Sequence, residues 1–473
     1  MRDTVSKSVQ IQTLAIPKET DITELFAVYA NRPWSMLLDS ANSSHVNARF
    51  DFFVAAPMAT IVAFGTDCQI SENGQQDIRC QGNPLSIVRS LMKRVLGDSD
   101  SLPLQDNNPG IHLPFHCGAA GYFGYDLGRC FENLPDSSEH SYSTPDMAIG
   151  LYTWCVVKDN VKGVFYLVEL PGFDNPNTND IESLVNAKLH YSDSNFCMST
   201  SWQANMDKTR YQQSLDKVHE YLRAGDCYQV NFAQRFSAQY QGSEWSAYLS
   251  LRKANQAPFS AFIRLDESVI LSISPERFIS LNDKKVKTQP IKGTRPRFVD
   301  NKVKDQEQIT LLQSSPKDKA ENLMIVDLLR NDLSRSCAPG TIDVPQLFEV
   351  ESFEAVHHLV STVTGQLDDN FDAYDLLQGA FPGGSITGAP KVRAMEIIDE
   401  LEPNRRNIYC GSIGYIDVLG NMDTNICIRT LLCENDTMYC WAGGGIVLDS
   451  TSEDEYQESL DKVSKILPIL ERL

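Results

Sequence analysis

The chain has 473 residues, of which 42% are hydrophobic and 22% are charged. These values are ordinary for a globular enzyme, and the length allows two or three average domains or one large intertwined one. The 42 basic and 62 acidic side chains give a net charge of −20, which argues against nucleic acid or an anionic membrane as a partner.

The N-terminus lacks the apolar segment of a signal peptide, and no apolar run approaches membrane-spanning length. The twelve cysteines are scattered without a CxxC pair, which disfavours a disulfide framework or a zinc site. We therefore expect a cytoplasmic protein with reduced thiols.

Residues 1–190 alternate short β-like runs with turns, and the runs 149–157 and 164–168 predict a hairpin. A polar, irregular segment at 192–205 follows. We interpret it as the seam between an N-terminal region, 1–190, and a C-terminal region, 200–473.

Beyond the seam, the apolar spacing of 207–223 predicts a helix that ends at Gly225. Strands are then expected from 228 to 291, and Ser315-Pro316 predicts the start of a helix that runs to about 333. Further helices are expected near 372–380, from Pro390, and over 452–470, with strands at 408–418 and 425–433. Because strands and helices do not alternate strictly, the pattern favours an α+β fold.

One lysine in the C-terminal region stands at a predicted strand end. Val286, Thr288 and Pro290 alternate with polar residues, and Gly293-Thr294 breaks the run, which places Lys292 at a turn. Arg295 and Arg297 follow closely. Nearby cations and partial burial disfavour the ammonium form, so this amine is a candidate nucleophile. The alternative is a solvated strand-end lysine.

Two glutamates are candidates for a metal site. Glu321 shares a helical face with Ile325 and Leu328, so its carboxylate requires a cation partner or a metal. The last helix opens with a capping box that accounts for Glu455 but not for Glu458, one turn later. Two carboxylates from different helices suit Mg²⁺. Pairing of Glu321 with an arginine and solvation of Glu458 are the alternatives.

Other residues carry weaker signals. Glu276 follows the apolar run 269–273, where a raised pKa would suit a general acid. Arg429 lies in the apolar run 426–432 and requires an anionic partner. The glycine-rich stretches 382–391 and 443–445 are either anion-binding backbone or tight turns.

Five segments together resemble the family of chorismate-utilising enzymes. They are Pro290-Ile-Lys-Gly-Thr294, Lys319-Ala-Glu-Asn-Leu-Met-Ile-Val-Asp-Leu-Leu-Arg-Asn-Asp332, His358-Leu-Val-Ser361, Pro382-Gly-Gly-Ser-Ile-Thr-Gly-Ala-Pro-Lys391 and Gly443–Gly445. Their order and spacing match over roughly residues 200–470. The N-terminal region resembles that of anthranilate synthase component I. The resemblance implies a large intertwined β-sheet sandwich with flanking helices.

The resemblance also implies a reaction. Relatives that make anthranilate carry alanine where this chain has Lys292, whereas lysine there implies amination of chorismate. The lysine would attack ring carbon C2 and displace the C4 hydroxyl, and ammonia would then add at C4 to give 4-amino-4-deoxychorismate. Glu276 matches the general acid and His358 the residue that assists near C4. Relatives that add water use a lysine where this chain has Gln229, so water addition is disfavoured.

The remaining site residues follow from the same resemblance. Glu321 and Glu458 match the Mg²⁺ ligands, which favours Glu458 over Glu455. The substrate-binding positions are Gly293, Thr294, Tyr409, Arg429, Gly443, Gly444 and Gly445.

The N-terminal region resembles relatives that bind tryptophan between the segments 37–40, 47–50 and 258–260. The matching positions are Ser40, Asn47, Ala48, Arg49, Phe50, Pro258, Phe259 and Ser260. Simple packing of a hydrophobic core is the alternative interpretation.

The chain lacks the Cys/His/Glu motifs of a glutaminase, so a separate glutamine amidotransferase subunit is expected to supply ammonia for the p-aminobenzoate branch of folate synthesis. An anthranilate-forming large subunit and a silent tryptophan-binding regulatory subunit are the competing hypotheses.

Overall fold

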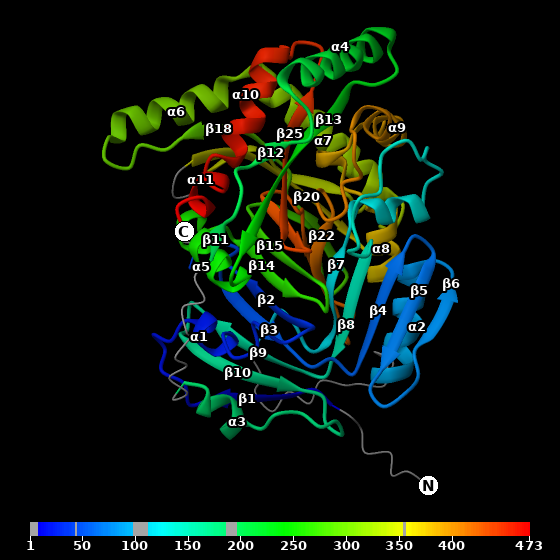
Figure 1. Cartoon of the computed structure of the whole chain (residues 1–473), viewed down its shortest axis with the longest axis vertical. Helices are drawn as coiled ribbons and strands as arrows, with labels where there is room; N and C mark the ends of the chain where they lie inside the picture. The colour runs from blue at the N-terminus through cyan, green and yellow to red at the C-terminus, as the bar shows by residue number, and fades with distance from the viewer. Residues whose placement is uncertain (1–7, 43–44, 98–111, 186–195, 353–355) are drawn as a thin grey trace.

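A computed structural model describes residues 8–42, 45–97, 112–185, 196–352 and 356–473. Within these ranges the strands form two large antiparallel sheets, one of 13 strands and one of 12. The sheets contact each other directly, since the ring of Phe52 in one lies edge-on to Tyr415 in the other, with ring centroids 5.3 Å apart. Helices flank these sheets (Figure 1). The predicted α+β class and sandwich architecture are confirmed.

The first sheet combines strands from the beginning, middle and end of the chain. Its order is β1 (Gln10–Leu14), β10 (Val164–Glu169), β9 (Trp154–Asp159), β3 (Phe50–Val54), β2 (Ser35–Asp39), β14 (Phe259–Arg264), β15 (Ser268–Ser274), β24 (Thr430–Glu434), β25 (Thr437–Ile446), β13 (Gln229–Gln241) and β11 (Cys197–Met198). The short strands β12 (Gln203–Ala204) and β21 (Gly388–Ala389) also pair with β13.

The second sheet is interleaved in the same way. Its order is β18 (Ile291–Pro296), β20 (Val356–Gln366), β17 (Lys285–Thr288), β16 (Arg277–Asn282), β23 (Met422–Asn425), β22 (Ser412–Asp417), β7 (Gly118–Phe123), β8 (Met147–Tyr152), β4 (Ala59–Phe64), β5 (Asp67–Glu72) and β6 (Ile78–Gln81), with β19 (Asp343–Ser352) on β20.

The regions 1–190 and 200–473 share both sheets. Strand β2 pairs with β14, and β7 pairs with β22. Residues 192–195 of the polar seam lie outside the described ranges, and the rest of the seam contains β11 and β12. The seam is therefore a boundary in the sequence that does not separate two sheets.

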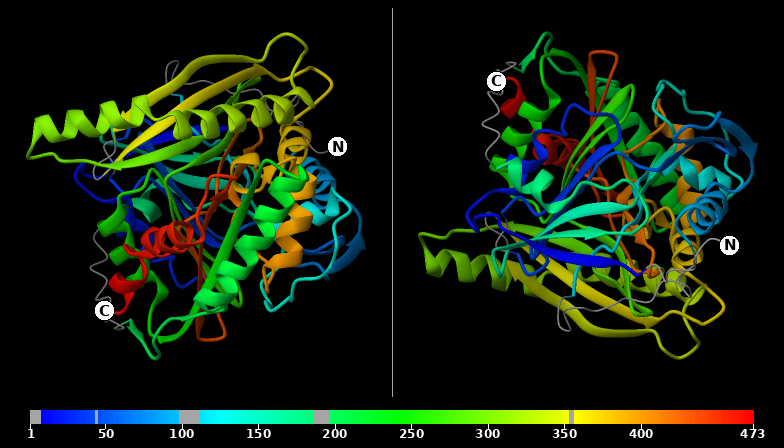
Figure 2. Two further views of the ribbon diagram at one scale, coloured as in Figure 1. Left: turned by 90° about the horizontal axis from the view of Figure 1, so that it is seen from above. Right: turned by 90° about the horizontal axis from the view of Figure 1, so that it is seen from below.

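Helices cover the outer faces and ends of the sheets (Figures 1 and 2). They are α1 (Ile22–Phe26), α2 (Pro84–Leu96), α3 (Thr178–Ser183), α4 (Lys208–Ala224), α5 (Glu244–Asn255), α6 (Lys302–Ser314), α7 (Pro316–Ser334), α8 (Ala373–Ala380), α9 (Lys391–Leu401), α10 (Ser452–Val463) and α11 (Leu467–Leu470), with 3-10 turns at Tyr125–Cys130 and Gly384–Ile386. In the described part of the chain, no helix combines the length and apolarity needed to cross a bilayer.

Two predicted helix boundaries are confirmed by their caps. Asp207 accepts a hydrogen bond from the backbone N–H of Arg210 at the start of α4, and Gly225 ends that helix in the left-handed conformation. Ser315 accepts from the N–H of Asp318 at the start of α7, which has proline in its first turn. Both ends follow the capping preferences read from the sequence.

The prediction around Lys292 is partly wrong. The break in the strand falls at Gln289-Pro290, between β17 and β18, and Lys292 is the second residue of β18. Gly293, with φ of +69°, forms a bulge in the pairing of β18 with β20. A bulge redirects side chains locally without ending a strand, so Gly293 changes the direction of β18 where a turn was predicted.

Other boundaries also differ. The run 149–157 divides into β8 and β9, which belong to different sheets, although the hairpin of β9 and β10 is confirmed. Helix α5 interrupts the expected strands of 228–291, and the expected last helix is divided into α10 and α11. Helix α6 was not predicted. The expected strand at 425–433 is interrupted, because Arg429 has φ of +53° and lies just before β24.

Candidate active site

Ser385 joins Lys292 to Glu276. The hydroxyl of Ser385 donates to Oε1 of Glu276 at 3.1 Å, and its carbonyl accepts from Nζ of Lys292 at 3.4 Å. Ser385 lies in the 3-10 turn Gly384–Ile386, within the glycine-rich stretch considered above. The structure therefore places the candidate nucleophile and the candidate acid on either side of one turn.

Glu276 follows β15 and is 6% exposed. Burial raises the pKa of its carboxyl to about 7, against partial compensation by Lys292 and by the hydrogen bond from Ser385. A carboxyl group with this pKa is substantially protonated near neutral pH. It can therefore donate a proton, as a general acid must.

Lys292 is half-buried in β18. Burial lowers the pKa of its ammonium, and the positive charge of Lys462 acts in the same direction, whereas Glu276, Glu321 and Glu458 oppose both. The sequence prediction assigned the cation effect to Arg295 and Arg297. Arg295 instead lies 3.6 Å from the carboxylate of Asp318, and the contributing cation comes from α10.

His358 lies on β20 beside the bulge of β18. Its Nδ1 is 3.0 Å from the hydroxyl of Thr294 and 3.3 Å from the carbonyl oxygen of Gly293. Burial is the main cause, and the positive charge of Arg429 the second, of a pKa of His358 that is lowered to about 4. The imidazole is therefore neutral near pH 7, which suits a hydrogen-bonding role better than a cationic one.

The two candidate metal ligands face the same site from different helices. Glu321 on α7 and Glu458 on α10 both act on the charge of Lys292. Burial, with a contribution from Glu458, raises the pKa of Glu321. Burial alone would raise the pKa of Glu458. The ammonium of Lys462, whose Nζ lies 2.7 Å from Oε1 of Glu458, has the larger effect and holds this pKa below its usual value.

Two carboxylates are fewer ligands than a closed metal cage requires. Among the described residues, no three His, Cys, Asp or Glu side chains are grouped to hold a metal ion. Mg²⁺ often binds through one or two protein carboxylates and retains several waters or substrate oxygens. The partly exposed Glu321 and Glu458 fit that kind of site.

The prediction that Glu455 serves as a helix cap is wrong. Thr451 is the N-cap of α10 and accepts from the N–H of Asp454. Glu455 is buried and accepts a hydrogen bond from the hydroxyl of Ser450 at 2.7 Å. A Cβ atom on Gly444 would approach Oε2 of Glu455 to 2.9 Å and Oε1 of Glu458 to 3.3 Å. Both carboxylates therefore lie against this glycine.

The glycines of β25 allow close approach on both sides of the strand. The carbonyl of Gly443 accepts from Lys462 at 2.7 Å, and a Cβ on Gly445 would meet the amide nitrogen of Gln229 at 2.8 Å. Gln229 is fully buried, and neither its side-chain nitrogen nor its oxygen has a hydrogen-bond partner in the described part of the protein. A buried amide without partners is costly unless a ligand satisfies it.

Arg429 and Tyr409 border the same region. Burial lowers the pKa of Arg429, and the described residues provide no carboxylate partner for its guanidinium. Its charge acts on the neighbouring His358. The Tyr409 ring stacks on Trp441 with centroids 6.0 Å apart. A half-buried guanidinium without a carboxylate partner among the described residues favours an anionic ligand.

Lys391, at the end of the glycine-rich stretch, has a structural role. Its Nζ lies 2.8 Å from Asp332 on α7 and donates to the carbonyl of Ala380 at 2.7 Å. This buried pair fixes α9 against α7 and α8. The ammonium of Lys391 is therefore paired within the protein and is not available to bind an anionic ligand.

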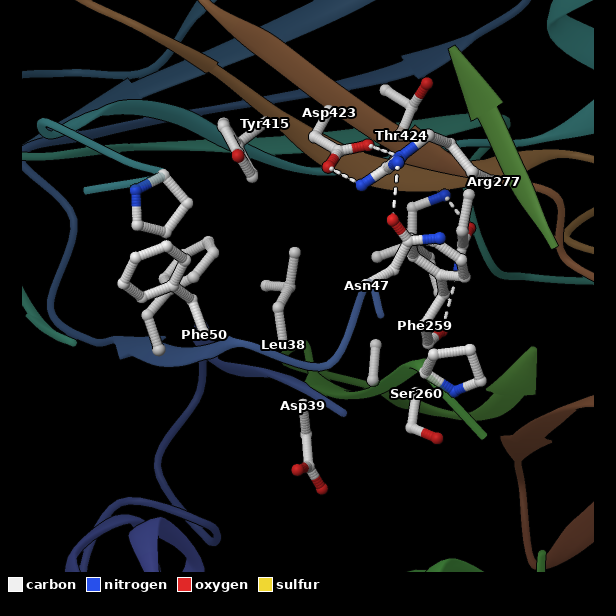
Figure 3. A pocket seen from close by; sticks show the side chains of 16 residues that line it. Leu38, Asp39, Asn47, Phe50, Phe259, Ser260, Arg277, Tyr415, Asp423 and Thr424 are labelled. Carbon is white, nitrogen blue, oxygen red and sulfur yellow. Dashed lines mark hydrogen bonds and ion pairs between the residues drawn. The ribbon is translucent and has the colours of Figure 1, made fainter. Parts of the chain in front are cut away.

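A separate cavity lies between the two sheets (Figure 3). Its walls are apolar and aromatic, with polar groups at the ends, and include Leu38, Asp39, Asn47, Phe50, Phe52, Pro258, Phe259, Ser260, Arg277 and Tyr415. Arg277 is held by both oxygens of Asp423 at 2.9 Å and by Asn47 at 3.1 Å. Five of the positions predicted for tryptophan line this cavity: Asn47, Phe50, Pro258, Phe259 and Ser260.

The other three predicted positions do not line the cavity. The Ser40 hydroxyl donates to Asp51 at 2.6 Å, and Arg49 forms an ion pair with Asp159 at 2.9 Å. Ala48 is buried, and its carbonyl lies 3.5 Å from the Ser40 hydroxyl. All three lie in the connection between β2 and β3, outside either strand, and these hydrogen bonds and this ion pair join them to residues that do not line the cavity.

Two site residues were not identified from the sequence. Lys462 lies four residues after Glu458. On a helix this spacing predicts an ion pair between the two side chains, so the sequence does contain a signal for Lys462. Ser385 gives no comparable local signal. It reaches Glu276 only because the turn after α8 folds against the end of β15.

The chain is similar to known proteins in both sequence and fold. The model of the chorismate binding enzyme family matches residues 36–468. The chain is 48% identical over 447 residues to aminodeoxychorismate synthase component 1 of Escherichia coli, covering 94% of this chain and 95% of that one. It is 49% identical over 459 residues to the protein of that name from Klebsiella aerogenes, covering 97% and 98%. The crystal structure of anthranilate synthase component I from Streptococcus pneumoniae superposes with a TM-score of 0.75 at 30% identity, covering 89% of this chain and 93% of that one.

Proposed function

Because the chain belongs to the family of chorismate binding enzymes, we propose that it is the component I of an aminodeoxychorismate synthase, which converts chorismate and ammonia to 4-amino-4-deoxychorismate. Relatives of that name match nearly the full length of the chain at 47–49% identity. The observation that carries the proposal is the pairing of Lys292 with Glu276 through Ser385.

The first chemical step uses these two side chains. The neutral amine of Lys292 forms a bond to C2 of the chorismate ring. Both conjugated ring double bonds shift by one position, and the bond from C4 to its hydroxyl breaks. Glu276 donates a proton to that hydroxyl, which leaves as water. The lowered pKa of Lys292 and the raised pKa of Glu276 favour the required protonation states. The covalent step divides one difficult substitution into two easier ones.

Ammonia completes the reaction. It forms a bond to C4, both ring double bonds shift back, and the bond from C2 to Lys292 breaks. This releases 4-amino-4-deoxychorismate and the free lysine, and the proton lost from the added ammonia returns to the carboxylate of Glu276. Gln229 has no basic nitrogen with which to activate water, so ammonia is the preferred nucleophile. The neutral imidazole of His358, held by Thr294, would orient groups near C4.

Substrate binding is assigned to groups that have no internal counterpart. Arg429 would pair with a carboxylate of chorismate, because its half-buried guanidinium has no carboxylate partner among the described residues. Gly443, Gly444 and Gly445 would allow the ring carboxylate to lie against the backbone of β25. Tyr409 and Thr294 would border the ring.

Glu321 and Glu458 are the residues that would hold Mg²⁺. Bound there, the ion would neutralise a substrate carboxylate and lower the cost of bringing an anion beside the acidic side chains of α10. The ion pair of Glu458 with Lys462 would be exchanged for the metal, and Lys462 would remain free to contact Gly443.

The cavity in Figure 3 is assigned to a tryptophan molecule. Its aromatic walls suit an indole ring, and Asn47 and Ser260, which also line it, would contact the polar end of the amino acid. The carboxylate of Asp39 is instead held by Arg252 and Tyr248. A glutamine amidotransferase subunit would supply ammonia, and the product would enter the p-aminobenzoate branch of folate synthesis.

Intact mass spectrometry tests the central step. Incubation with chorismate and Mg²⁺ without ammonia should add the mass of chorismate less one water, on Lys292. Lys292→Ala should abolish the adduct, whereas Lys285→Ala, at an exposed lysine of the neighbouring strand, should retain it. Turnover without any adduct would remove the covalent mechanism, and anthranilate with pyruvate as products would reject the assigned activity.

A further inference from the structure

A buried arginine lies behind the 3-10 turn that carries Ser385. Arg406 is 1% exposed and lies four residues after Glu402, the C-cap of α9, which is 5% exposed. Arg406 donates to both carboxylate oxygens of Glu402, from Nε at 3.0 Å and from Nη2 at 2.7 Å. The same carboxylate accepts from the backbone N–H of Ala233 at 2.9 Å. The proposed reaction steps do not use this buried ion pair.

The guanidinium of Arg406 also reaches two backbone carbonyls. Its Nη1 donates to the carbonyl of Ile386 at 3.0 Å, and its Nη2 donates to the carbonyl of Asn231 on β13. The side-chain amide of Asn231 donates to the same Ile386 carbonyl at 2.9 Å, and its backbone N–H donates to the carbonyl of Thr387 at 2.8 Å. Donors from two residues therefore hold the end of the turn that carries Ser385.

Two aromatic rings restrict the guanidinium further. Its central carbon lies 4.8 Å from the ring centroid of Tyr125 and 5.5 Å from that of Tyr409. Aromatic rings at such distances attract a cation and stack against the planar group of an arginine. The direction of Arg406 toward Ile386 is therefore fixed by packing as well as by hydrogen bonds.

A buried ion pair is a costly way to stabilise a fold. Removing both charges from water often costs more than their mutual attraction returns, and apolar residues of similar volume can give equal stability. What an arginine adds is a planar group whose N–H donors point in fixed directions. Arg406 uses this property to join one carboxylate to two carbonyls from separate segments of the chain. This arrangement indicates that the turn requires a defined position.

Ser385 passes that position on to the reacting groups. Its hydroxyl donates to Glu276 and its carbonyl accepts from Lys292, and the carbonyl of the next residue, Ile386, is the one that Arg406 holds. Burial raises the pKa of Glu276, and the hydrogen bond from Ser385 partly opposes this effect. A displaced turn would weaken that hydrogen bond and raise the pKa of the acid further.

We propose that Arg406, together with Asn231, is a positioning residue that holds Ser385 against Lys292 and Glu276. The inference rests on the proposed function, because those two side chains carry its first step. Arg406 and Asn231 act on the reaction only through the turn.

The variant Arg406→Lys tests this role. Lysine keeps the positive charge but cannot reach Glu402 and both carbonyls at once. We expect kcat for the amination of chorismate with ammonium to fall at least about tenfold, while KM for chorismate changes by less than about threefold. The matched control is Arg405→Lys at the neighbouring position, where the guanidinium pairs with Asp136. It should leave both constants unchanged.

A double-mutant cycle with Ser385→Ala distinguishes positioning from general destabilisation. Ser385→Ala should lower kcat in the unmodified protein, but by less than about twofold further in Arg406→Lys, because the hydrogen bond is already lost there. Independent, multiplicative losses would overturn the proposal. Asn231→Leu removes the other side-chain donor to Ile386 and leaves no buried charge unpaired. It should couple to Ser385→Ala in the same way, and it decides the question if Arg406→Lys does not fold.

The pKa of Glu276 gives a measurement that does not depend on turnover. Carbon-13 NMR of the labelled carboxyl, assigned with Glu276→Gln, should show this pKa raised by at least roughly 0.5 in Arg406→Lys and in Ser385→Ala. Arg405→Lys should not change it. An unchanged pKa in Arg406→Lys would overturn the positioning role. Absence of amination by the unmodified protein would instead reject the proposed function, and the titration would still decide whether Arg406 positions Ser385.

Discussion

The substitution Glu276→Gln separates catalysis from stability. The glutamine preserves the shape of the side chain and can still accept a hydrogen bond from Ser385, but it cannot donate the proton of a carboxylic acid. With a pKa of about 7, about half of the wild-type side chains are protonated at pH 7 and about one tenth at pH 8. An ordinary glutamate would be protonated to only about 0.3% at pH 7.

Turnover should therefore depend on pH in a defined direction. Wild-type kcat should be highest below pH 7 and should fall about tenfold for each further unit above it, if proton donation limits the rate. Glu276→Gln should lose roughly 10²–10⁴-fold in kcat at pH 6.5, the usual contribution of a general acid. The assay is formation of 4-amino-4-deoxychorismate from chorismate, Mg²⁺ and ammonium, followed by chromatography.

The substitution Glu276→Gln should raise stability although it lowers turnover. The folded pKa of Glu276 lies above its unfolded value of 4.5, so the folded protein holds a proton that the unfolded chain has released between about pH 4.5 and 7. Stability is then lost as pH rises through this window, by about 3 kcal/mol in total. Glu276→Gln removes this loss, so the variant should gain about 2.5 kcal/mol relative to wild type between pH 5 and pH 8.

Denaturant unfolding of wild type and variant at the two pH values measures this difference. Glu267→Gln, at an exposed position, should show nearly the same stability difference from wild type at both. A Glu276→Gln variant whose stability relative to wild type does not depend on pH would refute the burial argument. Retention of full activity above pH 7.5 in that variant would refute the role of Glu276 as acid.

Three further predictions concern other parts of the site. Gly293→Ala should destabilise the protein by about 1–3 kcal/mol in thermal unfolding and should reduce kcat. The added methyl group would meet Leu312 at 2.8 Å, in a residue with φ of +69°. The control Gly420→Ala, at φ of +83° with no atom within 4 Å, should incur only the backbone strain and leave kcat unchanged. Asp332→Ala should lower the free energy of unfolding in denaturant by about 3–5 kcal/mol, because it leaves the buried ammonium of Lys391 without its carboxylate. The control Asp327→Ala, at an exposed position of the same helix, should change it by less than about 0.5 kcal/mol. Equal effects of the two substitutions would contradict the structural role of the Lys391–Asp332 pair. Glu321→Gln and Glu458→Gln should each raise the Kd for Mg²⁺, measured by calorimetry, at least roughly tenfold. The control Glu453→Gln, at an exposed position on the same helix as Glu458, should leave this Kd unchanged. Unchanged affinity in both Glu321→Gln and Glu458→Gln would place the metal elsewhere.

The sequence by itself determined the local structure where short-range chemistry is decisive. Asp207, Gly225 and Ser315 specify helix ends through their own hydrogen bonds and backbone preferences, and these were predicted correctly. The α+β class also followed from the order of strand and helix patterns. The family motifs contain Lys292 and Glu321, and the same resemblance assigned roles to Glu276 and Glu458 by their positions.

Only the tertiary structure decided how these residues act on one another. Ser385 joins Glu276 to Lys292 across more than ninety residues of sequence, and no local pattern carries such a contact. Lys462 replaces the neighbouring arginines as the cation beside Lys292, because α10 lies over the site whereas Arg295 is directed to Asp318. The shifted pKa values arise mainly from burial, which depends on packing of the whole chain. The sequence therefore determined which groups are present, and the fold decided their charges and their partners.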